Sequence, residues 1–168
     1  MTINLQEIRK AVQDYLDHKV NTSISKLTPD VAGTINPDEE FTFSITATNP
    51  KTENGGIRLI NVRYHLHSTD PAKVKLKVPP VATATARSGY SSSDAVLAPD
   101  TLVADMYLFP TEDTLDVDDI DTISGLKGKA LALGNPNISF RIYADVDMDY
   151  LFPKNQNSGG STRTVPIQ

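Results

Sequence analysis

Two segments near the middle of the chain alternate regularly between apolar and polar residues. The first spans residues 40–49 and the second residues 58–68, with a loop rich in Pro, Asn and Gly between them. The apolar set is Phe41, Phe43, Ile45, Ala47, Ile60, Val62, Tyr64 and Leu66. Successive side chains of a strand point to opposite faces, so this period of two predicts one packed face and one face in water. We expect two half-buried strands that face each other across a sandwich and hold the fold.

Other segments carry strand patterns of different strength. Residues 21–29 alternate weakly, residues 137–150 give the longest alternation in the chain, and residues 123–134 fit either a short strand or a short helix. Residues 73–78 also alternate, with three lysines on the polar face and two prolines directly after them. These lysines are Lys73, Lys75 and Lys77. Such a row next to prolines is typical of an edge strand that resists pairing with another chain, and the alternative is an anion-binding stripe.

Residues 100–110 are apolar on both faces of the predicted strand. Leu102, Ala104, Met106 and Leu108 share one face, and Val103, Tyr107 and Phe109 share the other. A strand that is apolar on both faces is normally covered on both. We expect the N-terminal helix or a partner chain to provide the second cover, which makes Tyr107 and Phe109 candidate interface residues.

The first twenty residues predict an amphipathic helix. Asn4 is a favourable N-cap, and Glu7 completes a capping-box pattern three residues later. The apolar positions recur at steps of three and four residues and are Leu5, Ile8, Val12, Tyr15 and Leu16. A helix this short is marginal in water, so we expect the stripe to be buried. It either covers one end or edge of the sandwich or docks on a neighbouring subunit.

Three less regular segments complete the predicted organisation. Residues 81–99 are rich in Ala, Ser and Thr and predict a long excursion, which is our first candidate for a contact surface. Residues 111–121 form an acidic connection, and residues 154–168 predict a mobile tail in which 164–167 could add a strand to a neighbour. The predicted division is therefore a helical arm over 1–20, a sandwich over 21–153 and a flexible tail over 154–168.

Composition narrows the function classes. A chain of 168 residues with 39 % hydrophobic and 22 % charged residues fits one globular domain. The net charge of −5 argues against nucleic-acid binding, and the absence of cysteine excludes disulfides, thiolate chemistry and zinc sites of the cysteine type. The N-terminus has no apolar signal-peptide core, and no run approaches the length of a membrane span. We expect cytoplasmic synthesis without a signal peptide, no membrane insertion, and a final location in a virion or another extracellular particle.

Two groups of polar residues suggest metal binding. Asp116, Asp118, Asp119 and Asp121 have the oxygen density that calcium prefers, and we take Asp116, Asp118 and Asp121 as the candidate ligands. Their spacing does not fit the twelve-residue calcium loop, and the alternative is a set of solubilising carboxylates. His65 and His67 have the spacing of two ligands on one strand face, but only one further histidine exists in the chain. We expect no cofactor, with calcium as the exception to test.

No catalytic set emerges from the sequence. Serines are plentiful, but the G-x-S-x-G nucleophile elbow does not occur, and Gly55-Gly56 lies between two strands instead of preceding a helix. The sequence therefore predicts a protein that is not an enzyme.

Residues 35–66 resemble immunoglobulin-like modules of bacteria and archaea, of the cell-adhesion-related and NEW3-like kind. The resemblance rests on Pro37-Asp38-Glu39 as the turn, residues 46–49 as the end of the first strand, and Leu59–Val62 as the start of the next. It implies an all-β fold, an immunoglobulin-like antiparallel sandwich of about seven to nine strands, here with one N-terminal amphipathic helix.

These expectations favour a non-enzymatic structural subunit. We expect it to belong to a self-assembled particle, such as a phage or phage-tail-like particle, and to contact protein neighbours through the helix and the long loops. Pairing between the lysine row and aspartate-rich rows would set the register of that contact. The alternative is a β-sandwich module that binds a small ligand or carbohydrate through loops at one end, with or without calcium.

Overall fold

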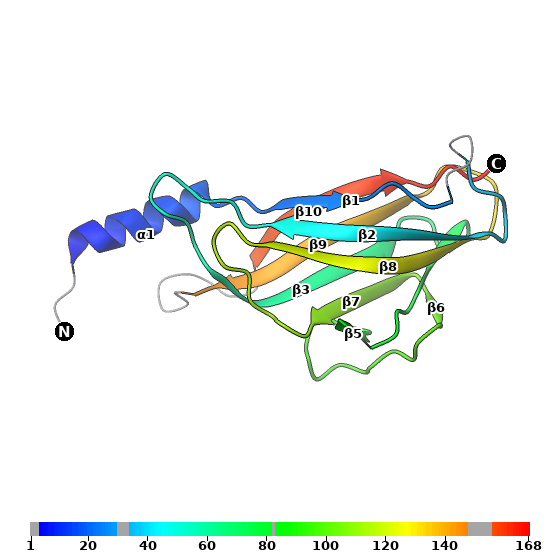
Figure 1. Cartoon of the computed structure of the whole chain (residues 1–168). Coiled ribbons are helices and arrows are strands. Elements are labelled where there is room, and N and C mark those ends of the chain that lie inside the picture. Colours follow the sequence, from blue (N-terminus) through cyan, green and yellow to red (C-terminus); the bar gives the residue numbers. More distant parts are fainter. Residues whose placement is uncertain (1–3, 30–33, 82, 148–155) are drawn as a thin grey trace.

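The computed structural model describes residues 4–29, 34–81, 83–147 and 156–168, with the side chains of 156–158 left aside. Two antiparallel five-stranded sheets pack face to face, and one helix extends from an end of this sandwich (Figure 1). The helix α1 spans Leu5–Asp17, and Asn4 caps it, with Asn4 Oδ1 accepting a hydrogen bond from the backbone N–H of Gln6 at 2.9 Å. The predicted fold class, a β-sandwich with one N-terminal helix, is confirmed.

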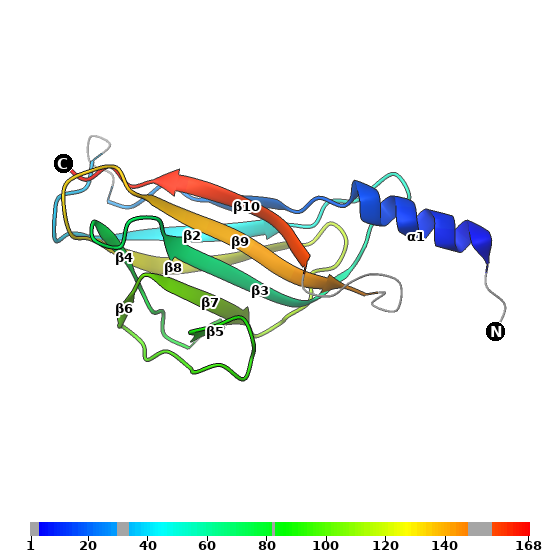
Figure 2. The same cartoon turned by 180° about the vertical axis from the view of Figure 1, so that it is seen from behind.

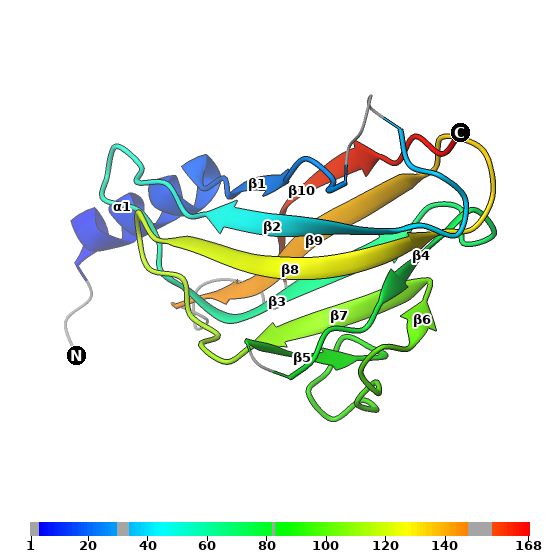
Figure 3. The same cartoon turned by 45° about the vertical axis from the view of Figure 1, so that its right-hand side comes forward.

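The first sheet has the strand order β1-β2-β8-β4-β6. Its strands are β1 (Asn21–Ile24), β2 (Glu40–Thr48), β4 (Val74–Lys77), β6 (Leu102–Val103) and β8 (Ile120–Ala130). The second sheet has the order β10-β9-β3-β7-β5. Its strands are β3 (Leu59–Ser68), β5 (Ala84–Arg87), β7 (Asp105–Pro110), β9 (Asn137–Val146) and β10 (Gln156–Thr164). Figure 2 shows the two layers from behind, and Figure 3 shows them in an oblique view.

The core lies between the two sheets and is built by the alternating residues. Phe41, Phe43, Ile45 and Ala47 of β2 are all buried, as are Val62, Tyr64 and Leu66 of β3. The strands β2 and β3 thus lie in opposite sheets and send apolar side chains into the same core, as their alternation predicts. The prediction for Ile60 is wrong: it is half-buried and Leu59 is buried instead, because the register of β3 shifts between Ile60 and Arg63. Gly128 belongs to this packing, because a Cβ there would lie 2.3 Å from the Phe41 ring. Burial of this kind contributes roughly 25 cal/mol per Å² of apolar surface.

Residues 100–110 do not form one strand. Leu102–Val103 is β6 and pairs with β4 in the first sheet, whereas Asp105–Pro110 is β7 and pairs with β3 in the second. The chain changes sheets at Ala104, whose carbonyl oxygen accepts a hydrogen bond from the Ser68 N–H. A continuous alternation cannot reveal this crossing, because strands in either sheet send their apolar side chains into the same core.

Two predictions about the ends of the sheets are wrong. The lysine-bearing strand β4 is not an edge strand, since β6 pairs with it on its outer side. The tail is not free either: residues 156–164 form β10, which pairs with β9, and Val165 and Ile167 are buried. Ile167 forms bridges with Ile35 and Gly134 of its own chain instead of a neighbour. This segment has no apolar alternation, and backbone pairing holds it in the sheet. It also approaches β1 closely, because a Cβ added to Gly159 would lie only 2.7 Å from the Val20 carbonyl oxygen.

Candidate functional site

The helix presents its apolar positions in two different environments. Tyr15 packs against the core, and Ile8 is half-buried. Leu5, Val12 and Leu16 are 69 %, 40 % and 67 % exposed. The helix points away from the end of the sandwich, so most of its length has no strand beside it (Figures 1 and 2). The structure therefore divides the predicted stripe, and Leu5, Val12 and Leu16 form what we call the exposed stripe.

Contacts near the C-terminal end of the helix fix it to the body. Asp14 is buried and accepts a hydrogen bond from the Thr52 hydroxyl. His18 Nε2 lies 3.1 Å from Asn49 Oδ1, which can only accept, so this nitrogen carries the proton. Burial lowers the pKa of His18, and the hydrogen bond to Asn49 opposes part of that effect. The base of the helix is anchored while the exposed stripe remains uncovered.

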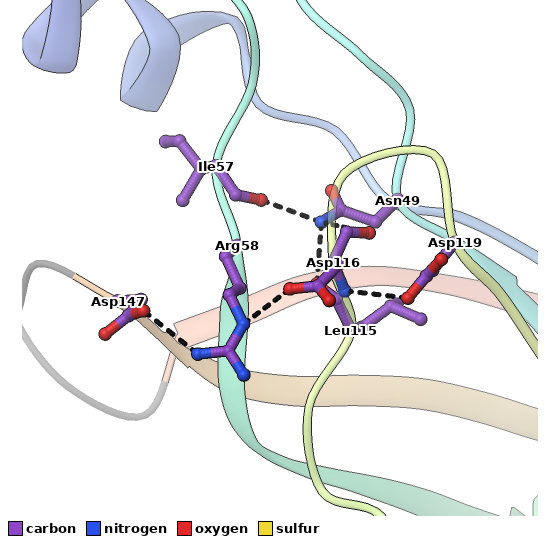
Figure 4. Close-up of polar contacts among 7 residues, drawn as sticks. All are labelled: Asn49, Ile57, Arg58, Leu115, Asp116, Asp119 and Asp147. Carbon is purple, nitrogen blue, oxygen red and sulfur yellow. Dashed lines mark hydrogen bonds and ion pairs between the residues drawn. The ribbon is translucent and has the colours of Figure 1, made fainter.

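Asn49 joins three segments beneath the helix. Its side chain is fully buried, and Nδ2 donates to the carbonyl oxygens of Ile57 at 2.7 Å and Leu115 at 3.0 Å (Figure 4). These carbonyls belong to the start of the β3 segment and to the acidic connection. Buried backbone acceptors are costly to leave unpaired, so this one amide determines how the loops at the helix end are held.

The acidic connection is neutralised in part by Arg58. The Nε of Arg58 lies 2.5 Å from Asp116 Oδ1, and its Nη1 lies 3.1 Å from Asp147 Oδ2 (Figure 4). Asp119 Oδ2 accepts from the backbone N–H of Asp116 at 3.2 Å. The two ion pairs are solvent-exposed, so they position the loop more than they stabilise the fold.

The three aspartates predicted to bind metal do not converge. Asp116 pairs with an arginine, Asp118 Oδ1 accepts from the Lys51 N–H at 3.1 Å, and Asp121 accepts from the buried Tyr64 hydroxyl. Burial, together with the carboxylate of Asp121, raises the pKa of Tyr64. Among the residues that the structure describes, no three His, Cys, Asp or Glu side chains are grouped to hold a metal ion. The carboxylates of this connection serve turns and sheet-to-sheet contacts.

Tyr107 and Phe109 point outward from β7, but the N-terminal helix does not cover them. Their cover comes from the 81–99 excursion of the same chain. The Tyr90 ring meets Tyr107 edge to face with centroids 5.8 Å apart, and the Arg87 guanidinium carbon lies 5.7 Å from the centroid of Phe109. The expectation of cover from the helix is wrong, because the helix lies beyond the end of the sheet.

The excursion completes a ring cluster on the outer face of the second sheet. The cluster consists of His65, His67, Tyr90, Tyr107 and Tyr143. Ring centroids lie 4.3 Å apart for His65 and Tyr107, 5.1 Å for His65 and His67, and 5.3 Å for Tyr90 and Tyr143. Burial lowers the pKa of His67, and the neighbouring His65 adds to that effect. The histidines thus act as packed rings in an outer layer.

A cavity of about 530 Å³ opens beside this cluster, and we call it the flank pocket. Residues 90–92, the end of β7 with the chain after it, the β3 bulge and one residue of β9 line it. Its principal side chains are Asn61, Arg63, Tyr90, Phe109, Asp113 and Asp145. Sequence analysis missed this pocket, although the Ser-rich excursion and the second apolar face of 102–109 were its two signals. Neither pattern predicts that the excursion packs against this apolar face.

Comparisons with known proteins do not assign the chain to a family. No protein-family model matches the chain, and no curated protein matches its sequence. Among solved structures, the CARDB domain of a Pyrococcus furiosus protein aligns with a TM-score of 0.46 and 12 % identity, covering 89 % of this chain and 94 % of that one. The C-terminal domain of the Streptococcus agalactiae AgI/II polypeptide BspA aligns with a TM-score of 0.44 and 11 % identity, covering 90 % and 50 %.

A third similar structure is AvmM, which catalyses macrocyclization in alchivemycin A biosynthesis. It aligns with a TM-score of 0.48 and 10 % identity, covering 89 % of this chain and 88 % of that one. At these identities the likeness concerns the fold alone. The chain is a β-sandwich with one N-terminal helix. No helix in its described residues has both the length and the apolar character needed to cross a membrane.

Proposed function

We propose that the protein is a non-enzymatic structural subunit of a larger self-assembled particle, such as a phage or phage-tail-like particle. The observation that carries this proposal is the exposed stripe. A helix of 13 residues gains little stability from its backbone alone, so apolar side chains along it normally find cover. Leu5 and Leu16 have most of their surface in water, on a helix that stands off the body. The stripe has the form of an assembly contact.

The partner we propose for the exposed stripe is the same stripe of a second copy. Leu5 and Leu16 lie at its two ends with Val12 between them. An antiparallel pairing places Leu5 of one copy on Leu16 of the other, and a two-fold contact requires such a self-complementary patch. Three side chains make a small interface, so a single pair is weak, and several such contacts within a particle reinforce one another.

We further propose that the sandwich is a module of the cell-adhesion-related or NEW3-like kind, used as a spacer that carries the helix. Support comes from the pattern in residues 35–66, which comprise the turn before β2, β2 itself, the following loop and most of β3. These residues hold the core and leave contact to the parts attached to it.

Sedimentation velocity across a concentration series tests the assembly contact. We expect the wild-type chain to self-associate with rising concentration and Leu16→Lys to sediment as a monomer. Ile120→Lys is the matched control, because Ile120 is also 67 % exposed but lies at the start of β8 on the sandwich. A general loss of surface hydrophobicity would affect both variants equally.

A strict monomer at all concentrations, unchanged when residues 1–19 are deleted, would sink the proposal. Equal weakening by Leu16→Lys and Ile120→Lys would also contradict it, because the helix would then have no special part in association.

A further inference from the structure

The flank pocket lies beside the outer face of the second sheet, and no residue of the helix or of its exposed stripe lines it. Its volume of about 530 Å³ is in the range of sites that hold small organic molecules. Two charged side chains of its wall are almost completely buried: Arg63 is 9 % exposed and Asp145 is 5 % exposed. Charged side chains are seldom buried to this extent, and both of these lie on the wall of the cavity.

An irregularity of β3 shapes the pocket. The register between β3 and β9 shifts between Ile60 and Arg63, and Asn61 within this bulge has a φ of +53°. Asparagine tolerates this conformation better than most residues, but it is still strained. The bulge lets Asn61 Nδ2 donate to Asp145 Oδ2 at 2.9 Å and Arg63 Nη1 donate to the Asn61 carbonyl oxygen at 2.7 Å. Bulges of this type redirect side chains next to binding sites.

The excursion supplies the opposite wall. The Arg63 guanidinium carbon lies 4.2 Å from the centroid of the Tyr90 ring, which joins the two walls. Ser91 and Ser92 follow Tyr90 directly and line the pocket with their hydroxyl-bearing side chains. The loop is tied back by Asp94, whose Oδ2 accepts from the Ser91 N–H at 2.7 Å. These contacts hold the wall of the pocket in place.

The lining matches one class of ligand. It combines an amide, a guanidinium, two carboxylates and several hydroxyls with the rings of Tyr90 and Phe109. Planar polar groups pair with neighbouring hydroxyls two at a time, and aromatic rings pack on C–H faces. One guanidinium against two carboxylates leaves no excess positive charge for a phosphate or sulfate, and the polar walls do not suit a lipid chain. We propose that the flank pocket binds a neutral, hydroxyl-rich ligand of the carbohydrate class, of mono- or disaccharide size.

The experiment is a titration of the full chain with a defined saccharide panel. The neutral probes are the methyl glycosides of glucose, galactose, mannose and N-acetylglucosamine, together with maltose, cellobiose and lactose. Glucuronate and glucose 6-phosphate are the charged comparators. Saturation-transfer NMR identifies binders at millimolar concentration, and calorimetry gives the affinity. We expect saturable binding of at least one neutral saccharide and weaker binding of the charged comparators.

Two substitutions in the excursion assign the binding to the pocket. Ser92→Trp fills the cavity and should weaken binding by about tenfold or more, which corresponds to about 1.4 kcal/mol. Ser88→Trp places the same ring on an exposed position of the same loop outside the pocket and should leave the affinity unchanged. Asp113→Ala, which removes an exposed carboxylate of the rim, serves as a second test with an intact core. The melting temperature of each variant verifies folding.

Failure of every neutral saccharide to bind would overturn the proposal, and so would a preference for the charged comparators. Equal affinity of wild type, Ser92→Trp and Asp113→Ala would show that a bound saccharide sits elsewhere. Leu16→Lys should bind saccharide like the wild type, so this result stands or falls independently of the assembly contact.

Discussion

The outer faces of the two sheets differ in the side chains they present and in whether a loop covers them. The first sheet presents threonines and lysines, and two pairs of lysines lie directly opposite each other across β4 and β8. These pairs are Lys75 with Lys129 and Lys77 with Lys127. The second sheet presents the ring cluster, and the loop after β5 packs Tyr90 onto it. One face is a plain solvated ladder, and the other is a second layer of packing with a pocket at its side.

This difference shows how an outward position acquires a role. Side chains on both faces leave the core by the same strand alternation. On the first sheet they meet one another, as in the ion pair between Lys77 of β4 and Glu40 of β2, and no segment that the structure describes is shown to stack rings over them. On the second sheet a loop returns over them, so rings stack, a histidine pKa falls and a cavity forms. A covering segment is what converts an outer face into a candidate site.

Among the substitutions that test this difference between the two faces, we expect the largest loss of stability from a change at Tyr107. Tyr107→Ala removes a ring stacked on His65 and touching Tyr90, and should lower the free energy of unfolding by about 2–3 kcal/mol. Thr46→Ala, at an outward position of β2 in the first sheet, should change it by less than about 0.5 kcal/mol. Urea unfolding measures the free energy of unfolding of both variants, and an unchanged m-value shows that the comparison with the wild type is valid. Equal losses in the two variants would remove the distinction between the faces.

Uncovering the second face should have a smaller effect. Tyr90→Ala removes the ring that contacts Tyr107, Tyr143 and the Arg63 guanidinium, and should cost about 1–2 kcal/mol. Tyr90→Phe keeps the ring and should retain most of that stability. The same urea titration decides the matter, and a loss as large for Phe as for Ala would assign the effect to the hydroxyl instead of the ring.

The first sheet offers a stabilising change. Lys75 lies opposite Lys129, and like charges in this position repel. Lys75→Glu should raise the free energy of unfolding by about 0.5 kcal/mol, and less so at high salt. Lys75→Gln separates the loss of repulsion from the gain of attraction and should give an intermediate value. No gain in either variant would indicate that water already screens the pair.

The smallest differences we expect lie in the pH dependence of stability. Burial lowers the pKa of His67 below its ordinary value of 6.5, so the unfolded chain takes up the proton first and stability falls as the pH decreases below about 6.5. Lys77 lowers the pKa of Glu40 below 4.5, so the stability from this pair is present above pH 4.5 and is lost as the pH falls through the folded-state pKa.

Each face therefore has its own pH window, and single substitutions separate them. His67→Gln should flatten the stability profile below about pH 6.5 and leave the acid limb intact, whereas Glu40→Gln should do the reverse. Urea midpoints measured from pH 3 to pH 8 test this. A His67→Gln profile identical to the wild type would contradict the assignment to the second face. Burial also lowers the pKa of His18. His18 therefore contributes equally in both variants to the loss of stability below about pH 6.5.

The candidate sites were predictable to different degrees. The apolar positions of the helix follow from their spacing, but their division into a packed part and the exposed stripe depends on where the helix leaves the sandwich. The metal prediction at Asp116, Asp118 and Asp121 failed to give a ligand group, because density of carboxylates along a chain says nothing about where each one turns. The flank pocket joins residues from four separate segments, and no local pattern connects them.

Local chemistry alone determined most of the side chains that enter the core, where the helix begins, and that strands dominate the fold; the bulge of β3, which buries Leu59 in place of Ile60, is the exception. Period-two alternation and an N-cap are properties of a few neighbouring residues, and these survive in the folded chain. Only the tertiary structure decided that 102–110 is shared between two sheets, that 156–164 becomes β10, and that Tyr90 covers Tyr107. These outcomes depend on contacts between residues far apart in the chain. Backbone pairing and loop closure determine such contacts, and the local pattern of apolar and polar residues does not predict them.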